Sequence, residues 1–307
     1  MADTKAIANR IKSVRDTRKI TNAMYLIAST KLRKSRSNLE NTLPFFDALK
    51  GEIGKIVRHT HVHNSKYFID KNAVGEKEGT VGILVITADK GLAGAYNQNV
   101  IKETLRMIEQ HPDYRLFVVG EYGKHYFLSH NIAFDEGFDF PDHEPSLLRA
   151  RMIAGYIMDL YDNRKLSQVH IVYTNFKNAL TSEVTSYRLV PFEREHFTGE
   201  EDQNNLAANE FFEDQGNDEI LDFEYIPSPF EVMERCIPVY CIGIIYSVMV
   251  YSFCCEQNDR MMAMDSANQN ADKLLGELTV KFNHLRQNGI TQEITEISAS
   301  VKASQKS

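Results

Sequence analysis

Cysteine is scarce in this sequence, and the few that occur are unevenly placed. All four (Cys236, Cys241, Cys254 and Cys255) fall within one stretch of twenty residues, and no CxxC pair occurs. A disulfide framework would distribute its cysteines along the chain, so this pattern favours a reduced, intracellular protein. The polar, basic N-terminus lacks the apolar segment of a secretory signal, and we expect none.

Known catalytic and nucleotide-binding sequence motifs are also missing. The sequence has no G-x-G-x-x-G or P-loop pattern, no H-E-x-x-H and no G-x-S-x-G. The loop Thr87–Gly94 is the best candidate for a phosphate site, but a tight strand-to-helix turn that uses glycine explains it better. His125, His130 and His143 have no partnered nucleophile. We therefore predict no catalytic residues and no cofactor.

A metal site is the next possibility to weigh. His59, His61 and His63 alternate in a polar, turn-rich segment. Zinc sites combine such histidines with cysteine or a well-placed carboxylate, and neither stands nearby in the sequence. A solvated loop is the better interpretation, and we predict no metal.

Charge is distributed asymmetrically. The chain up to Arg36 contains ten Lys or Arg against Asp3 and Asp16 only, whereas residues 199–225 contain ten Asp or Glu and no Lys or Arg. The acidic segment is predicted to be a solvated loop, and the basic end to face a partner. Nucleic acid is disfavoured as that partner, because Tyr25 is the only aromatic residue interleaved with the positive charges.

The last third of the chain predicts one long helix. Ser228, Pro229 and Glu231 form a helix start, with Ser as N-cap and Pro at the first helical position, and no proline follows Pro238. Apolar residues then recur at the a and d spacing of a coiled coil, with a skip near Gly289. They are Met264, Ala267, Ala271, Leu274, Leu278, Phe282, Leu285, Ile290, Ile294, Ile297 and Val301.

Within this helix the stretch Cys236–Cys255 contains no charged residue. Its length would allow a membrane span, but it contains Pro238, tyrosines and serines, and it continues directly into the seam. A helix segment buried on all sides by neighbouring protein is the favoured interpretation.

The N-terminal segment, residues 2–57, predicts a second long helix, which Pro44 should kink or end. Its apolar residues also recur at helical spacing: Ile7, Ile11, Val14, Ile20, Met24 and Ile27. Two such helices at opposite ends of a chain predict an antiparallel pair in which each buries the stripe of the other.

The middle of the chain alternates strands and helices. Strands are predicted at residues 81–87, 116–119, 169–173 and 184–190, and helices at 97–110, 122–128 and 146–161. This alternation predicts an open, mostly parallel α/β sheet. The predicted fold is therefore α/β plus coiled coil, with a long antiparallel helical hairpin from the two chain ends and an inserted sheet domain. The expected domains are 1–58, 80–226 (with the acidic loop 199–222) and 228–303.

Three segments resemble one known family. Residues 11–24 (IKSVRDTRKITNAM), 290–297 (ITQEITEI) and 87–94 (TADKGLAG) are similar to signature motifs of the gamma subunit of F-type (rotary) ATP synthase. The resemblance extends over nearly the whole chain in the same order and is weakest between about 135 and 251. It implies a central rotor stalk that turns, as one copy, inside a hexamer of alternating alpha and beta subunits. The beta subunits would carry the catalysis.

The resemblance also implies contacts. Met24, Arg260, Arg286 and Gln287 match shaft residues that touch the beta subunit, and the tip from Thr291 would sit in an apolar bearing of the hexamer, with Gln292, Ile294 and Ile297. We expect Lys31 and Arg33 to face acidic loops of beta. The stalk's foot would rest on the ring of c subunits and bind the epsilon subunit. Membrane contact would occur only through that ring, on the cytoplasmic face of a bacterial plasma membrane.

The sequence departs from the family pattern at some positions. Asp265 stands where many relatives carry Lys, Asn288-Gly289 replaces smaller residues, and the acidic loop holds no regulatory dithiol. Two other functions stay open at this point. One is a dinucleotide-binding enzyme with helical arms, which the missing glycine fingerprint disfavours. The other is a coiled-coil adaptor or scaffold protein, attached to a membrane through Cys236–Cys255.

Overall fold

The computed structural model describes residues 2–59, 65–69, 79–140, 144–176, 181–198 and 224–304. It divides into two compact units, one formed by Met1–Ser29 with Arg260–Ser307 and the other by Thr30–Asp259. We call these the helical-pair unit and the sheet unit and describe each by itself. The predicted acidic loop 199–222 and the side chains of His61, His63 and His143 lie outside the described residues.

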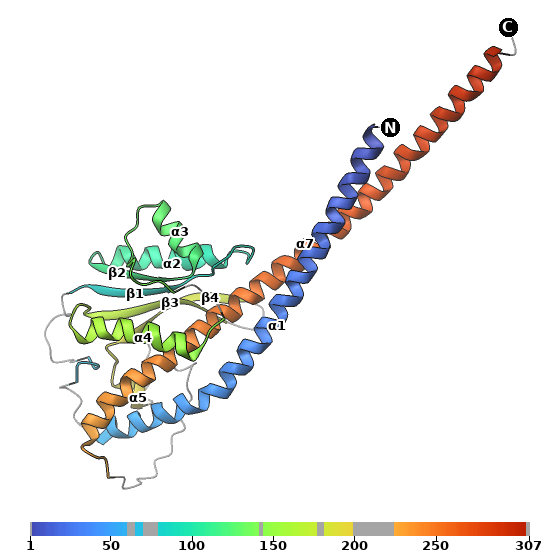
Figure 1. The fold of residues 1–307 in the computed structure, drawn as a ribbon. Coiled ribbons are helices and arrows are strands. Elements are labelled where there is room, and N and C mark those ends of the chain that lie inside the picture. The colour runs from blue at the N-terminus through green and yellow to red at the C-terminus, as the bar shows by residue number, and fades with distance from the viewer. Residues whose placement is uncertain are drawn as a thin grey trace. The chain divides into compact units, whose positions relative to one another are not determined.

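The sheet unit is built on four strands. They are β1 (Val81–Ile86), β2 (Tyr114–Val119), β3 (Gln168–Phe176) and β4 (Ser182–Val190). Their order is β2-β1-β3-β4, with β1 parallel to both of its neighbours and β4 antiparallel to β3 (Figure 1). Two of the three pairings are parallel, so the prediction of a mostly parallel open sheet is confirmed.

Helices cover both faces of this sheet. They include α2 (Tyr96–Gln110), α3 (Glu121–Ser129) and α4 (Leu147–Asp162). Successive strand residues point to opposite faces: Ile83 and Val85 join the apolar cluster under α2 and α3, whereas Leu84 and Ile86 join the cluster that contains α4. This burial on both faces accounts for the continuous apolar run at residues 81–86.

A short helix, α5 (Glu195–Thr198), follows β4 and was not predicted from the sequence. It carries His196, whose Nε2 lies 2.8 Å from the hydroxyl oxygen of Tyr240. Burial, and to a smaller extent the charge of Lys50, lowers the pKa of His196 to about 3. The side chain is therefore neutral in the folded protein at neutral pH, among the rings of Phe192 and Phe197.

The long C-terminal helix, α7 (Pro229–Ser304), begins where the sequence predicted. The Glu231 backbone N–H donates a hydrogen bond of 3.2 Å to Ser228 Oγ, which caps the first turn. The helix contains 76 residues, which corresponds to a length of about 114 Å at 1.5 Å per residue. It continues through Pro238 without ending.

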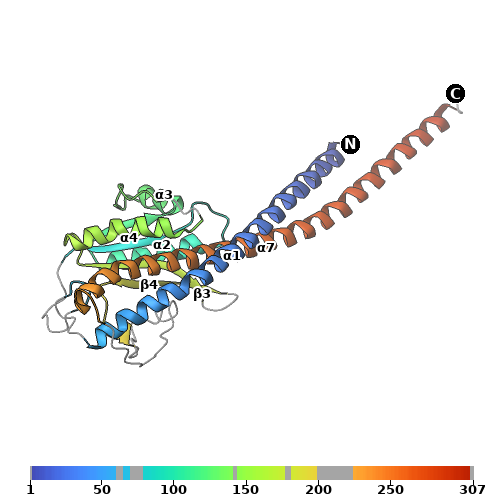
Figure 2. The same ribbon diagram turned by 60° about the horizontal axis from the view of Figure 1, so that its bottom comes forward.

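The uncharged stretch Cys236–Cys255 of α7 is a core helix of the sheet unit. Ile237, Ile244, Ile245 and Val248 are all at most 1% exposed, and they share an apolar cluster with α4, which lies beside α7 (Figure 2). By length and composition α7 could cross a membrane, with a mean hydropathy of 1.8 in its most apolar window, but 72% of that window is buried inside the protein. The predicted buried helix is therefore confirmed.

The N-terminal helix, α1 (Ala2–His59), is assigned as one helix although Pro44 lies inside it. Its contacts fix its direction against α7. In the helical-pair unit, Arg18 Nε lies 2.9 Å from Asp272 Oδ1. In the sheet unit, a β-carbon on Gly243 would overlap the ring of Phe46, so the two helices approach closely there. Within the helical-pair unit, Arg18 pairs with Asp272 and Thr21 with Asn268, so residue numbers rise along α1 as they fall along α7, which confirms the antiparallel pairing.

Candidate functional site

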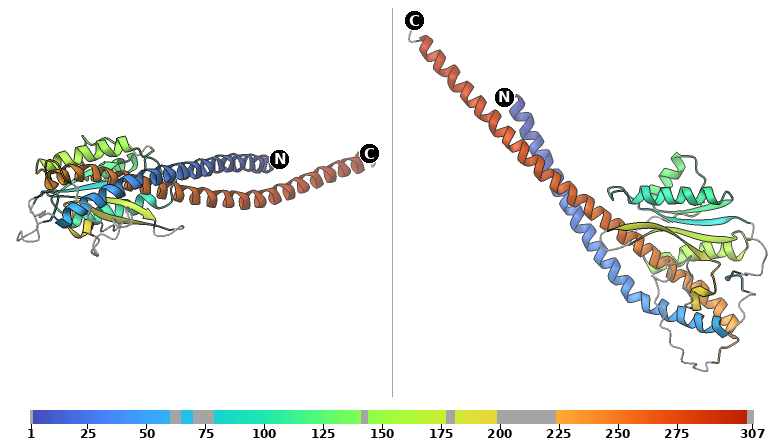
Figure 3. Two further views of the ribbon diagram at one scale, coloured as in Figure 1. Left: turned by 90° about the horizontal axis from the view of Figure 1, so that it is seen from below. Right: turned by 180° about the vertical axis from the view of Figure 1, so that it is seen from behind.

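The last turns of α7 form an exposed surface of the helical-pair unit. Continuing the register of the Arg18–Asp272 pair, α1 begins opposite about residue 288 of α7, and α7 extends past that point to its end (Figure 3). Ile290, Ile294 and Ile297 are 48%, 59% and 63% exposed. Their spacing of four and three places them on one face of the helix.

The polar residues predicted to contact a partner lie on the same turns. Arg286, Gln287, Thr291 and Gln292 are all exposed. Thr291 Oγ1 donates to the Gln287 carbonyl at 2.9 Å, and Gln292 Nε2 donates to Glu296 Oε1 at 2.9 Å. Both bonds are local to one helix, so a partner can replace them without disturbing the rest of the chain.

The predicted seam of α7 is confirmed from Met264 to Leu285. Every seam position in that range is buried or half-buried, while most residues between them are exposed. The predicted seam of α1 is confirmed at Ile7, Ile11, Val14 and Met24, which are half-buried, but it is wrong at Ile20 and Ile27. Ile20 and Ile27 are 61% and 56% exposed, and the contact with α7 passes instead through Thr21, which hydrogen-bonds to Asn268, and the buried Ala28.

The two remaining shaft residues are less accessible than those at the tip. Met24 on α1 and Arg260 on α7 are both half-buried in the helical-pair unit. A half-buried side chain keeps part of its surface for a partner, while its neighbours in the same chain fix its position. Ile20 and Ile27 were not predicted as contact residues, and their exposure adds an apolar surface to this part of α1.

The basic stretch around Lys31 is partly neutralised inside the sheet unit. Lys34 Nζ lies 2.8 Å and Lys31 Nζ 4.0 Å from the carboxylate of Glu144, and the hydrogen bond from Lys34 lowers the pKa of that carboxyl. Arg33 is exposed. Of the residues expected to face acidic loops of a partner, Arg33 is thus the one that points most openly to solvent.

The loop after β1 is filled by the chain's own polar groups. Thr87 Oγ1 donates to the Val119 carbonyl at 2.8 Å and accepts from the Gly123 N–H at 3.1 Å. Asp89 Oδ1 accepts from the Glu121 N–H at 3.2 Å, at the start of α3. A carboxylate therefore occupies the N-terminus of α3, whereas the helix that directly follows the loop is α2, which begins at Tyr96 without a side-chain cap. This geometry agrees with the predicted structural turn.

One feature of this loop was missed. Leu92 has a φ of 64° and is 65% exposed. A non-glycine residue in the left-handed region is uncommon, and here it carries an apolar side chain into solvent. The sequence signal for this conformation is weak, because positive φ is more common at glycine, and Gly91 and Gly94 stand in the same loop.

Of the candidate metal residues His59, His61 and His63, only His59 lies within the described residues. Within the ranges that the structure describes, no three His, Cys, Asp or Glu side chains are grouped closely enough to hold a metal ion. His59 Nδ1 lies 2.8 Å from the Lys55 carbonyl, as expected for a side chain that bonds to its own helix.

Comparison with known proteins identifies relatives along the full chain. Residues 3–303 match the family model described as ATP synthase. The "ATP synthase gamma chain" of Acetivibrio thermocellus is 36% identical over 99% of both chains, and that of Ruminiclostridium cellulolyticum is 38% identical over 97% of this chain and 98% of the relative. The central stalk in a Tetrahymena thermophila mitochondrial ATP synthase structure superposes with a TM-score of 0.56 at 23% identity, over 81% of this chain and 99% of that one.

Proposed function

The chain belongs to the ATP synthase gamma family, and on that premise we propose that it is the central rotor stalk, present as one copy in a hexamer of alternating alpha and beta subunits. It couples ion flow through the membrane ring to ATP synthesis or hydrolysis by rotating within the hexamer. The observation that carries this proposal is the end of α7, which extends past the start of α1 with three exposed isoleucines on one face.

A rotor stalk must transmit torque, and the helical pair supplies the stiffness. The seam from Met264 to Leu285 packs against α1, and the pair is held by Arg18–Asp272 and Thr21–Asn268 across the helices. Two helices packed along a continuous seam resist bending and twisting far better than one. The core segment of α7 inside the sheet unit anchors the same helix at its other end.

The contact with the hexamer must slide, so it should be sparse. The exposed tip provides Arg286, Gln287, Thr291 and Gln292 as polar contacts and Ile294 and Ile297 as apolar ones. Met24, Lys31, Arg33 and Arg260 contact the beta subunits further along the stalk. Apolar side chains suit the bearing because their contacts are non-directional, whereas directional hydrogen bonds would hold one rotational position.

The sheet unit would provide the contacts to the epsilon subunit and the ring of c subunits. The protein would then be peripheral, on the cytoplasmic face of a bacterial plasma membrane. ATP chemistry is assigned to the beta subunits.

Reconstitution tests the proposal. The full chain, mixed with alpha and beta subunits of a relative, should purify at one copy per hexamer and support steady ATP hydrolysis. A chain that ends at Gln287 should assemble but lose turnover or torque severalfold. Failure of the full chain to enter the complex would reject the rotor role and favour an adaptor.

A second experiment distinguishes the effect of the length of the tip from the effect of its apolar side chains. Replacing Ile290, Ile294 and Ile297 by serine keeps the length, and we expect a smaller loss than truncation causes. Val280→Ser is the matched control, since Val280 is 71% exposed but lies before the tip. Equal effects of the control and the triple variant would show that the tip has no special role.

A further inference from the structure

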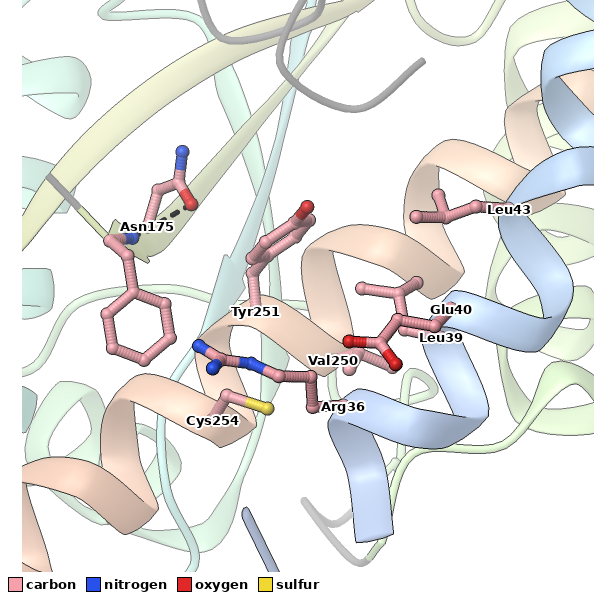
Figure 4. Close-up of a pocket in the computed structure, with 9 residues that line it drawn as sticks. Arg36, Leu39, Glu40, Leu43, Asn175, Val250, Tyr251 and Cys254 are labelled. Carbon is pink, nitrogen blue, oxygen red and sulfur yellow. Dashed lines mark hydrogen bonds between the residues drawn. The ribbon is translucent and has the colours of Figure 1, made fainter. Parts of the chain in front are cut away.

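A pocket of 340 Å³ lies within the sheet unit between α1, the end of β3 and α7 (Figure 4). Its base is apolar, formed by Leu39, Val250 and Cys254, which are all at most 5% exposed. Burial raises the pKa of the Cys254 thiol to about 11, so this sulfur is uncharged at neutral pH. The volume falls at the lower end of the range of about 300–1,000 Å³ that is typical of small-molecule sites.

Two opposite charges stand at the rim of this pocket. Arg36 and Glu40 are one helical turn apart on α1, and both side chains are directed into the pocket (Figure 4). The Arg36 guanidinium lies over the ring of Phe176, with its central carbon 5.6 Å from the ring centroid. Stacking on the ring leaves the N–H edge of the guanidinium available to bind an anion.

Arg36 and Glu40 do not neutralise each other. Within the described residues, neither side chain forms a hydrogen bond or an ion pair. Their order along the helix, cation before anion, is the less favourable one for an i, i+4 pair. Within the described residues, the pocket therefore offers one cation and one anion that do not pair with each other, together with an apolar base.

We propose that this pocket binds a small zwitterion with an apolar body, of the class of a free aromatic α-amino acid. The ligand carboxylate accepts hydrogen bonds from Arg36, the ammonium group donates to Glu40, and the side chain covers Leu39, Val250 and Cys254. Residues four apart on a helix have β-carbons about 5–6 Å apart, which allows one α-carbon to lie between the two charges. This site is separate from the rotor role.

The same charges exclude other ligand classes. A nucleotide brings several negative charges, which a single arginine beside a glutamate would not bind. A purely apolar molecule would leave both rim charges to be partly desolvated without compensation. A zwitterion matches both charges, and the modest volume limits it to about the size of one amino acid.

Calorimetric titration of the full chain with L-phenylalanine tests this proposal. We expect saturable binding at one site with a Kd of about 1 mM or tighter. Two analogues each lack one charge: 3-phenylpropionate has no ammonium group and phenethylamine has no carboxylate. Each should bind at least tenfold more weakly than phenylalanine. Absence of saturation, or equal binding of all three compounds, would overturn the proposal.

Variants of the two rim residues then test which charged group of the ligand each residue binds. Arg36→Gln should weaken phenylalanine and phenylpropionate at least fivefold and leave phenethylamine unchanged or improved, and Glu40→Gln should give the mirror pattern. Misfolding would weaken all three compounds together, so the crossed pattern is specific to the pocket. Arg151→Gln, which removes an exposed cation on α4, is the control and should change nothing. If both rim variants bind phenylalanine like the unmodified chain, the assignment is wrong.

Discussion

The helix α7 runs through both units of this protein, but its surroundings differ between them. In the sheet unit, α7 is buried by strands and helices, and Ile245 is completely inaccessible to solvent. In the helical-pair unit, the same helix is paired with α1, and beyond Leu285 every described position is exposed. Stability is therefore concentrated in the sheet unit, and accessible surface in the helical-pair unit.

This difference is also visible in the chemistry of the side chains. The sheet unit buries hydroxyls, a histidine and three of the four thiols, whereas the helical-pair unit joins its helices with exposed polar contacts such as Arg18–Asp272. The proposed rotor function requires this separation, because a rotor stalk must keep its shape while its exposed surface moves against partners. The following predictions test whether it holds.

The largest contrast is expected between two isoleucines of α7. Ile245→Ala removes a fully buried side chain and should lower the free energy of unfolding by about 2–5 kcal/mol. Ile294→Ala, at a position that is 59% exposed, should change it by less than about 0.5 kcal/mol yet reduce ATP turnover in the reconstituted complex. Urea denaturation measures both energies. Similar destabilisation by the two variants would contradict the proposed separation.

The sheet unit should also be the acid-sensitive one. The pKa of His196 is about 3 when folded against an ordinary value of 6.5, so the unfolded chain binds the proton more readily. Stability from this group is complete above pH 6.5 and declines as the pH falls towards 3. By pH 5 the loss is about 2 kcal/mol, at 1.36 kcal/mol per pH unit.

The tyrosines allow this loss to be assigned to one unit. The chain has no tryptophan, and all of its tyrosines except Tyr25 belong to the sheet unit. Near-ultraviolet circular dichroism therefore reports on the sheet unit, while the far-ultraviolet signal reports on both. His196→Phe should flatten the dependence of stability on pH between 6.5 and 5. An unchanged slope in that variant would show that other groups dominate.

Two glycines of α7 give a contrast of intermediate size. Gly243→Ala places a β-carbon against the ring of Phe46, and overpacking of this kind costs about 1–3 kcal/mol. Gly276→Ala meets nothing within 4 Å and should stabilise the helix by up to about 1 kcal/mol. Thermal unfolding should shift in opposite directions for the two variants, and a shift in the same direction would refute this account of the helix crossing.

Local patterns in the sequence predicted much of this structure. Strand runs such as 81–86 and the start of α7 at Ser228 follow from residues that are close in sequence, and they agree with the structure to within a few residues. The seam of α7 was also correct up to Leu285. In each of these cases the local sequence pattern is compatible with only one type of structure.

The errors arose where two patterns competed or where a distant residue decided the outcome. On α1, Ile20 and Ile27 extend a plausible apolar stripe, but both are exposed, whereas Ala28 is buried and Thr21 hydrogen-bonds to Asn268 on α7. The partner of Lys34 is Glu144, more than a hundred residues away. Neither outcome could be read from spacing along the sequence.

The smallest expected effect concerns the ion pair between Arg18 on α1 and Asp272 on α7. Arg18 and Asp272 are both about half exposed, so solvent screens their attraction and the coupling energy should be below about 1 kcal/mol. A double-mutant cycle with Arg18→Ala and Asp272→Ala measures it directly. A coupling well above this value would mean that polar contacts, and not the seam of Met264 and Leu274, hold the helices together. The helical-pair unit would then depend on salt concentration, which repeating the cycle at high ionic strength would reveal.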